Sequence, residues 1–218
     1  MAYSATYDRV ISVNGVMVQE RATQSCDNAK GCSIALSAAI AGTLTTRTDN
    51  DTGVVTVASG HGITASDTVI VTWESAGVRY NRYNVDVTGV TSTTISIDLG
   101  AGTNLPSSST AVTIVIQRTE DCNLGSVQFT DLKALLFKGS GDYILVIETD
   151  DSGTEYHAYT VDADVGLGFV SGSSAPDGTA MTFDDVFTGI DPDEYIKKLH
   201  FGNIATTTNN VSANILHN

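Results

Sequence analysis

The feature that most constrains this chain is a succession of short runs rich in Val, Ile, Thr and Tyr, separated by turn-forming Gly, Asn, Asp and Ser. Several runs alternate apolar and polar residues, as a strand with one buried face does; Ile95, Ile97 and Leu99 share one face of 93–99. We therefore expect strands in 9–19, 34–40, 53–58, 68–73, 78–90, 93–99, 111–117, 143–149, 155–161, 167–170, 180–183, 196–201 and 211–216.

Two local signals add detail to this pattern. Asn14-Gly15 stands between two β-rich runs and is the strongest two-residue hairpin signal. The segment 130–137 (TDLKALLF) predicts one or two helical turns, because its three leucines fall on one helical face. No long helix is expected. The fold class is therefore predicted to be all-β, an antiparallel, jelly-roll-like β-sandwich with an inserted small β-barrel or β-sandwich module.

The domain arrangement is predicted to be nested. Residues 43–117 read as a self-contained module, and residues 1–42 plus 118–218 together build the host sandwich. The N-terminal hairpin with one further strand is too small to bury a core alone, and insertions into exposed loops cost little extra entropy. Two domains in series remain the alternative.

Charge and composition exclude several function classes. The chain carries 25 Asp+Glu against 11 Lys+Arg, a formal charge of −14, so neither nucleic acid nor an anionic membrane surface is expected as a partner. It has no apolar run long enough for a membrane helix and no secretory signal at its start. Its cysteines fit no zinc spacing and are expected to be reduced thiols, although a Cys26–Cys32 or Cys26–Cys122 disulfide stays open.

No residue carries a chemical signature, so we predict no catalytic, cofactor-binding or metal-ligating residue, and no cofactor. The segment 49–53 (DNDTG) has the acidic composition of a calcium-binding loop but lacks the ligand spacing of such a loop. It is interpreted as an Asx-rich turn. The acidic residues between 184 and 194 could gather a hard cation but are interpreted as a solvated acidic face. His61, between two glycines, is interpreted as a turn residue.

Aromatic residues offer the remaining candidates for binding. Tyr80 and Tyr83, with Arg79 and Arg82, form a local basic-aromatic patch, for which contacts to a protein partner are favoured over base stacking. Trp73 is expected in the core. A sugar-binding platform around His157 would need Tyr156 and Tyr159 together, but strand alternation places these two tyrosines on opposite faces.

Several strings resemble the virion structural proteins of tailed phages. They are VTVASGHGIT at 55–64, DTV at 67–69, Trp73, VRY at 78–80, NLP at 104–106, DLKAL at 131–135, the strand to Glu148-Thr149, and APDGT at 175–179. The resemblance implies a β-sandwich structural component and brings no catalytic residue. Together with the missing chemistry, it predicts a non-enzymatic capsid cement or decoration protein, made in the host cytoplasm and located in the virion.

Such a protein would bind the major capsid protein and would form a homo-oligomer, with a trimer favoured, because repeated weak contacts add up to avidity. Three alternatives stay open at this point. The first is a tail tube or adaptor ring, the second a fibre-like protein that recognises a host glycan, and the third, least supported, an enzyme such as a depolymerase.

Overall fold

The computed structural model describes residues 3–13, 16–26, 28–101, 104–120, 128–150, 153–163, 166–170, 186–187, 189–191 and 193–217. Within them the chain forms sixteen strands and one 3-10 turn, and every strand pair is antiparallel. This confirms the all-β prediction. Among these residues, no helix has the length and apolar character needed to cross a membrane.

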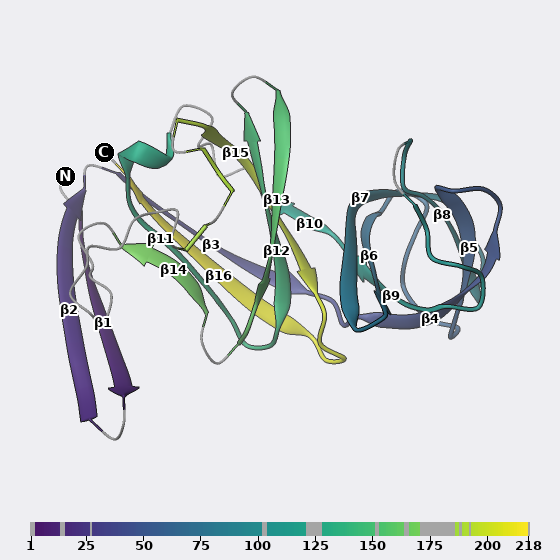
Figure 1. The fold of residues 1–218 in the computed structure, drawn as a ribbon, viewed down its shortest axis with the longest axis horizontal. Coiled ribbons are helices and arrows are strands. Elements are labelled where there is room, and N and C mark those ends of the chain that lie inside the picture. The colour runs from purple at the N-terminus through teal and green to yellow at the C-terminus, as the bar shows by residue number, and fades with distance from the viewer. Residues whose placement is uncertain are drawn as a thin grey trace.

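Six consecutive strands close into a barrel, in the order β4-β5-β8-β7-β6-β9 (Figure 1). They are β4 (Ile40–Arg47), β5 (Thr52–Val57), β6 (Thr68–Ser75), β7 (Val78–Val90), β8 (Thr94–Asp98) and β9 (Ala111–Ile116). Alternate residues fill the interior; in β8, for example, Ile95 and Ile97 are buried while their neighbours are half-buried. The alternation predicted for 93–99 is confirmed, and closure leaves the barrel without a free edge.

Two four-stranded sheets bury a second core between them. One has the order β10-β15-β12-β13 and the other β14-β11-β16-β3. Their bounds are β3 (Asn28–Leu36), β10 (Arg118–Glu120), β11 (Leu132–Gly139), β12 (Tyr143–Asp150), β13 (Thr154–Val161), β14 (Leu167–Val170), β15 (Tyr195–Asn203) and β16 (Asn209–His217). The shared core joins Leu135 and Phe137 of β11 to Leu145 of β12 and Phe201 of β15. A jelly-roll connectivity is not confirmed.

A long hairpin lies at the end of the molecule opposite the barrel (Figure 1). Strands β1 (Tyr3–Val13) and β2 (Val16–Cys26) pair with Val13 opposite Val16. This register leaves two residues for the connection, as the Asn14-Gly15 signal predicts, although those two residues lie outside the described part of the chain. The strand expected at 180–183 and the sequence APDGT also lie outside it.

The strand expected at 34–40 is wrong. The chain leaves the β14-β11-β16-β3 sheet after Leu36 and enters the barrel at Ile40. Residues 37–39 are the crossing, and the backbone N–H of Ala39 donates to the carbonyl of Ala205, 2.9 Å away. A continuous apolar run therefore hides the change from one sheet to another, because Leu36 at the end of β3 is buried and Ile40 at the start of β4 is half-buried.

The helix expected at 130–137 is also wrong. A 3-10 turn, η1 (Phe129–Asp131), precedes β11, which pairs with β14 on one side and β16 on the other. The register shifts between Leu132 and Ala134, so an extra residue separates inward-facing Leu132 from inward-facing Leu135. This bulge produces the three-residue spacing that resembles a helical period.

The barrel strands all come from 40–116, and β3 and β10, which flank that segment, belong to the two sheets. The division into a host of 1–42 plus 118–218 and an insert of 43–117 stays a prediction. Its boundary at 43 falls inside β4, so an insert that began there would lack the first three residues of a barrel strand.

The burial pattern of β11 can be tested with two substitutions in the same strand. Leu135→Ala removes a fully buried side chain and should lower the free energy of unfolding by about 3 kcal/mol, from lost burial and a residual cavity. Lys138→Ala changes an exposed position and should shift it by less than about 0.5 kcal/mol. Chemical denaturation measures both, and equal effects would contradict the assignment of inward and outward faces.

Candidate functional site

The two turn motifs singled out in the sequence are locally satisfied. Asp49 Oδ1 accepts from the backbone N–H groups of Asp51 (3.1 Å) and Thr52 (2.7 Å) and from the Thr52 hydroxyl (2.7 Å). These bonds, the Thr52 hydroxyl foremost, lower the pKa of Asp49 to about 2. His61 Nδ1 accepts from the Ile63 N–H, so its Nε2–H donates to the Thr91 carbonyl, 2.9 Å away. Both motifs therefore hold their own turns together.

The most exposed apolar surface lies where β6 turns into β7. Val78 is 53% exposed and Tyr80 is 37% exposed, and they are the exposed large hydrophobic residues among the side chains that the structure describes. Tyr80 stacks on the Trp73 ring with centroids 5.5 Å apart and planes 10° apart. The Arg82 guanidinium lies 5.3 Å from the Trp73 ring centroid. Trp73 itself is 6% exposed and belongs to the barrel core, as predicted. We call Trp73, Val78, Tyr80 and Arg82 the barrel tip.

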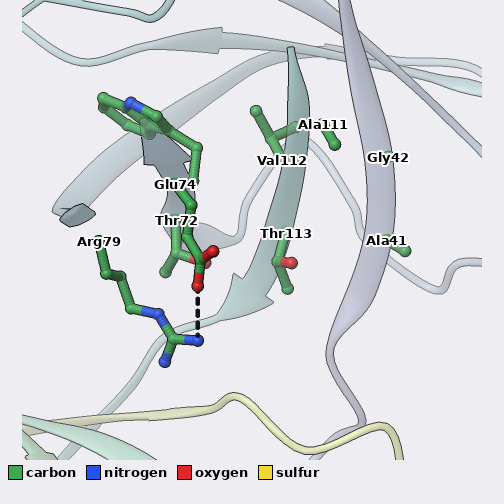
Figure 2. A pocket seen from close by; sticks show the side chains of 9 residues that line it. Ala41, Gly42, Thr72, Glu74, Arg79, Ala111, Val112 and Thr113 are labelled. Atoms are coloured by element: carbon green, nitrogen blue, oxygen red, sulfur yellow. Dashed lines mark hydrogen bonds and ion pairs between the residues drawn. The ribbon is translucent and has the colours of Figure 1, made fainter. Parts of the chain in front are cut away.

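Two shallow depressions flank the barrel tip and share Trp73 and Glu74. One, of about 300 Å³, extends over β4 and β9 and is lined by small side chains such as Ala41, Ala111 and Thr113 (Figure 2). On the β6–β7 side of this depression, the Arg79 guanidinium is paired with the cross-strand neighbour Glu74, 3.5 Å away (Figure 2). The other, of about 330 Å³, continues to Asn104 and Pro106. Small apolar and hydroxyl side chains of this kind accommodate a partner's side chain and offer no paired acid and base.

Tyr83 does not belong to the predicted patch around Tyr80. It lies between the barrel and β13, where its ring centroid is 5.3 Å from that of Tyr156 and its hydroxyl donates to the Tyr156 carbonyl at 3.3 Å. Tyr159, in contrast, packs edge-on against Phe187 in the sheet core, with centroids 5.5 Å apart. Tyr156 and Tyr159 thus occupy opposite faces of β13, as alternation predicts, and form no common platform.

A buried polar network joins the barrel to the β10-β15-β12-β13 sheet. His200 Nε2 lies 2.8 Å from Glu148 Oε2, and its Nδ1 lies 3.1 Å from Gln117 Nε2 and 2.9 Å from the Thr119 hydroxyl. Gln117 also bonds to Asn84 of β7: its Oε1 accepts from the Asn84 N–H at 2.9 Å, and its Nε2 donates to Asn84 Oδ1 at 2.5 Å. We call these five residues the seam network.

The seam network fixes the protonation of His200. Because Gln117 Oε1 already accepts from Asn84, the amide nitrogen of Gln117 faces His200 as a donor, and Nδ1 must accept. The proton therefore sits on Nε2 and points at Glu148. Burial lowers the pKa of His200, and the neighbouring Glu148 only partly offsets this effect. His200 is thus neutral at pH 7.

Sequence reasoning missed this network, although each partner left a signal. Glu148 interrupts the apolar run YILVIET, and His200 interrupts the run IKKLHF. A polar residue inside an apolar strand requires a buried partner. Nothing in the sequence pairs these two residues, because they lie 52 positions apart and meet only through the pairing of β12 with β15.

The pKa of His200 predicts how stability depends on pH. In the unfolded chain the pKa returns to about 6.5, above its folded value, so the unfolded state binds more protons below that pH. The contribution of His200 to the free energy of unfolding should therefore be constant well above pH 6.5. It should fall as the pH drops below 6.5. Urea unfolding of the wild type and His200→Asn between about pH 8 and pH 5.5 measures the difference. Identical pH slopes in the two proteins would contradict the neutral assignment.

Comparison with known proteins adds no relative to these observations. No protein-family model matches the chain, and no curated protein or solved structure shows significant similarity to it. The likeness to tailed-phage virion proteins thus rests on the sequence strings alone. What the chain does must be inferred from the barrel tip, the seam network and the arrangement of the sheets.

Proposed function

We propose that this chain is a non-enzymatic structural protein of the tailed-phage virion, a capsid cement protein that binds the assembled major capsid protein. The proposal includes a jelly-roll-like host sandwich, a homotrimeric state and synthesis in the host cytoplasm before assembly. It is supported by the sequence resemblance and by the all-β architecture. The observation that carries it is the barrel tip.

The barrel tip has the composition of a protein interface rather than of a reaction site. Aromatic residues and arginine are enriched where proteins bind one another, and covering exposed apolar surface such as that of Val78 is favourable. Trp73 stacks on Tyr80 and thereby orients it, which reduces the entropy lost when a partner covers it.

The formal charge of −14 fits the same role. Many copies on one particle must stay soluble and must not collect stray polyanions, and an acidic exterior achieves both. At the barrel tip, Arg82 lines the same depression as exposed Tyr80, and the nearby Arg79 is paired with Glu74 at 3.5 Å. A docking face that differs in charge from the rest of the molecule orients the protein on its target.

A glycan-binding fibre is the second candidate, and the geometry supports it less. A sugar platform needs aromatic faces exposed side by side, whereas Tyr156 and Tyr159 lie on opposite faces of β13 and Tyr83 is covered by Tyr156. The Tyr80 ring stacks against Trp73, which leaves one aromatic face for a ligand at the barrel tip.

The proposal predicts co-sedimentation with capsids assembled from the major capsid protein of the same phage. Val78→Asp and Tyr80→Ala should each weaken binding at least about tenfold, because they remove the exposed apolar groups of the barrel tip. Ser92→Asp is the matched control, since it adds the same charge to the exposed turn at the opposite end of β7 and should bind like the wild type. Trp73 is the single tryptophan of the chain, so its fluorescence reports directly on contact at the tip.

Three outcomes would count against the proposal. The first is an absence of capsid binding at about 10 μM protein. Repeated contacts on a lattice should give an apparent Kd below that concentration. The second is equal loss of binding in Val78→Asp and Ser92→Asp, which would indicate a general charge effect. The third is a hit on a glycan array that Tyr80→Ala abolishes, which would identify the fibre alternative.

A further inference from the structure

A cluster of three ionisable side chains lies at the rim of the core between the two sheets. Glu155 and His157 are two residues apart on β13 and therefore point to the same face as Tyr159, which packs into that core. Glu194 comes from the turn just before β15, on the other side of β12. Toward this cluster, the inward-facing row of β12 changes from apolar Leu145 and Ile147 to polar Thr149, which is paired with Glu155.

We propose that Glu155, His157 and Glu194 bind a divalent transition-metal ion of the zinc class. One ligand atom from each side chain lies within 4.8 Å of the other two. His157 Nε2 is 3.6 Å from Glu194 Oε2 and 3.9 Å from Glu155 Oε2. Zinc–ligand bonds of about 2.1 Å in a tetrahedron separate neighbouring ligand atoms by about 3.4 Å, so small side-chain shifts would close the site. This proposal departs from the sequence prediction of no metal ligand, which stays a prediction.

Glu194 supplies the independent observation. Its side chain is only 9% exposed, and its Oε2 atom is buried with no hydrogen-bond partner. That atom is the one directed at His157. A carboxylate oxygen removed from water without a donor is costly, and a cation at the centre of the cluster would satisfy it.

An internal comparison separates this cluster from an ordinary ion pair. In the seam network, His200 Nε2 and Glu148 Oε2 are 2.8 Å apart, the distance of a direct hydrogen bond. The shortest nitrogen–oxygen distance in the cluster is 3.6 Å, too long for such a bond and close to the separation of two ligands on one ion. His157 Nε2 is also in a long hydrogen bond of 3.4 Å with the Thr149 hydroxyl, which an ion bound at Nε2 would replace.

The donor set indicates the class of metal. Ca²⁺ and Mg²⁺ prefer oxygen ligands only, whereas an imidazole nitrogen with two carboxylates suits Zn²⁺ and its neighbours. The Glu155 side chain is 60% exposed, which leaves a route for the ion and a position for water as a further ligand. A bound ion would tie edge strand β13 to the start of β15 across β12. The proposal does not depend on the capsid function.

Zinc titration of the metal-stripped full-length chain tests this inference. We expect one Zn²⁺ per chain with a Kd below about 10 μM by calorimetry, and a higher Tm with Zn²⁺ than without it. Glu155→Gln and Glu194→Gln should each weaken binding more than about tenfold. Glu74→Gln is the matched control, because it removes an exposed carboxylate of the barrel and should leave the Kd unchanged.

Cobalt absorption identifies the ligands, because Co²⁺ bound to cysteine thiolates gives an intense ultraviolet charge-transfer band that nitrogen and oxygen ligands lack. The inference is overturned by any of four results: no stoichiometric Zn²⁺ binding at about 100 μM, a thiolate band, equal affinities of Glu155→Gln and Glu74→Gln, or Ca²⁺ or Mg²⁺ bound as tightly as Zn²⁺. If Glu194→Gln fails to fold, the Zn²⁺ affinity of Glu155→Gln still tests the inference, because substitution of this exposed residue leaves the core intact.

Discussion

Strand β12 is buried on both faces, and the rest of the architecture depends on this constraint. Its inward residues Tyr143, Leu145 and Ile147 belong to the core between the two sheets. Its outward residues Ile144 and Val146 pack against Ile70 and Val115 of the barrel. An antiparallel sheet usually leaves one face to water, so a strand without an exposed face requires a second covering layer. Here the barrel is that layer.

Burial on both sides explains why polar residues near β12 form networks. Glu148 ends the outward row of β12, in a position without access to water, and it is paired with His200 and Lys197. Thr149 ends the inward row, and its hydroxyl is hydrogen-bonded to His157 Nε2 at 3.4 Å. Since an unpaired buried charge costs several kcal/mol, each polar terminus of the doubly buried strand must have a partner of its own.

The parts of the fold that the sequence predicted are those governed by local pattern. Alternation identified β8 through Ile95 and Ile97, and the two-residue signal Asn14-Gly15 matched the register of the N-terminal hairpin. Local pattern failed at β11, where a bulge gave Leu132 and Leu135 a helix-like spacing. It also failed at 34–40, which was predicted as one strand. Apolar character does not distinguish one strand from the ends of two strands that belong to different sheets.

The candidate sites followed the same division. The patch around Tyr80 and Arg82 was visible because its residues are neighbours along one hairpin, although Tyr83 had to be removed from it. The seam network and the cluster of Glu155, His157 and Glu194 were not visible. Each joins segments that are far apart in sequence and that meet only through strand pairings that sequence periodicity does not specify. Acidic residues near 194 read as a solvated face because a count of charges carries no information about burial.

The seam also determines how the barrel tip is presented. Its apolar contacts, Ile70 and Val115 against Ile144 and Val146, are non-directional and would tolerate rotation of one body against the other. Gly202 allows a close approach at this point, since a Cβ there would come within 2.6 Å of the Ile70 side chain. Hydrogen bonds are directional, and the seam network links Asn84 of β7 through Gln117 to His200 of β15. The polar network therefore sets the orientation of the barrel, whereas the apolar contacts supply most of the attraction. The docking surface that we propose at the end of the barrel would need that fixed orientation for many copies to meet a regular lattice in the same way.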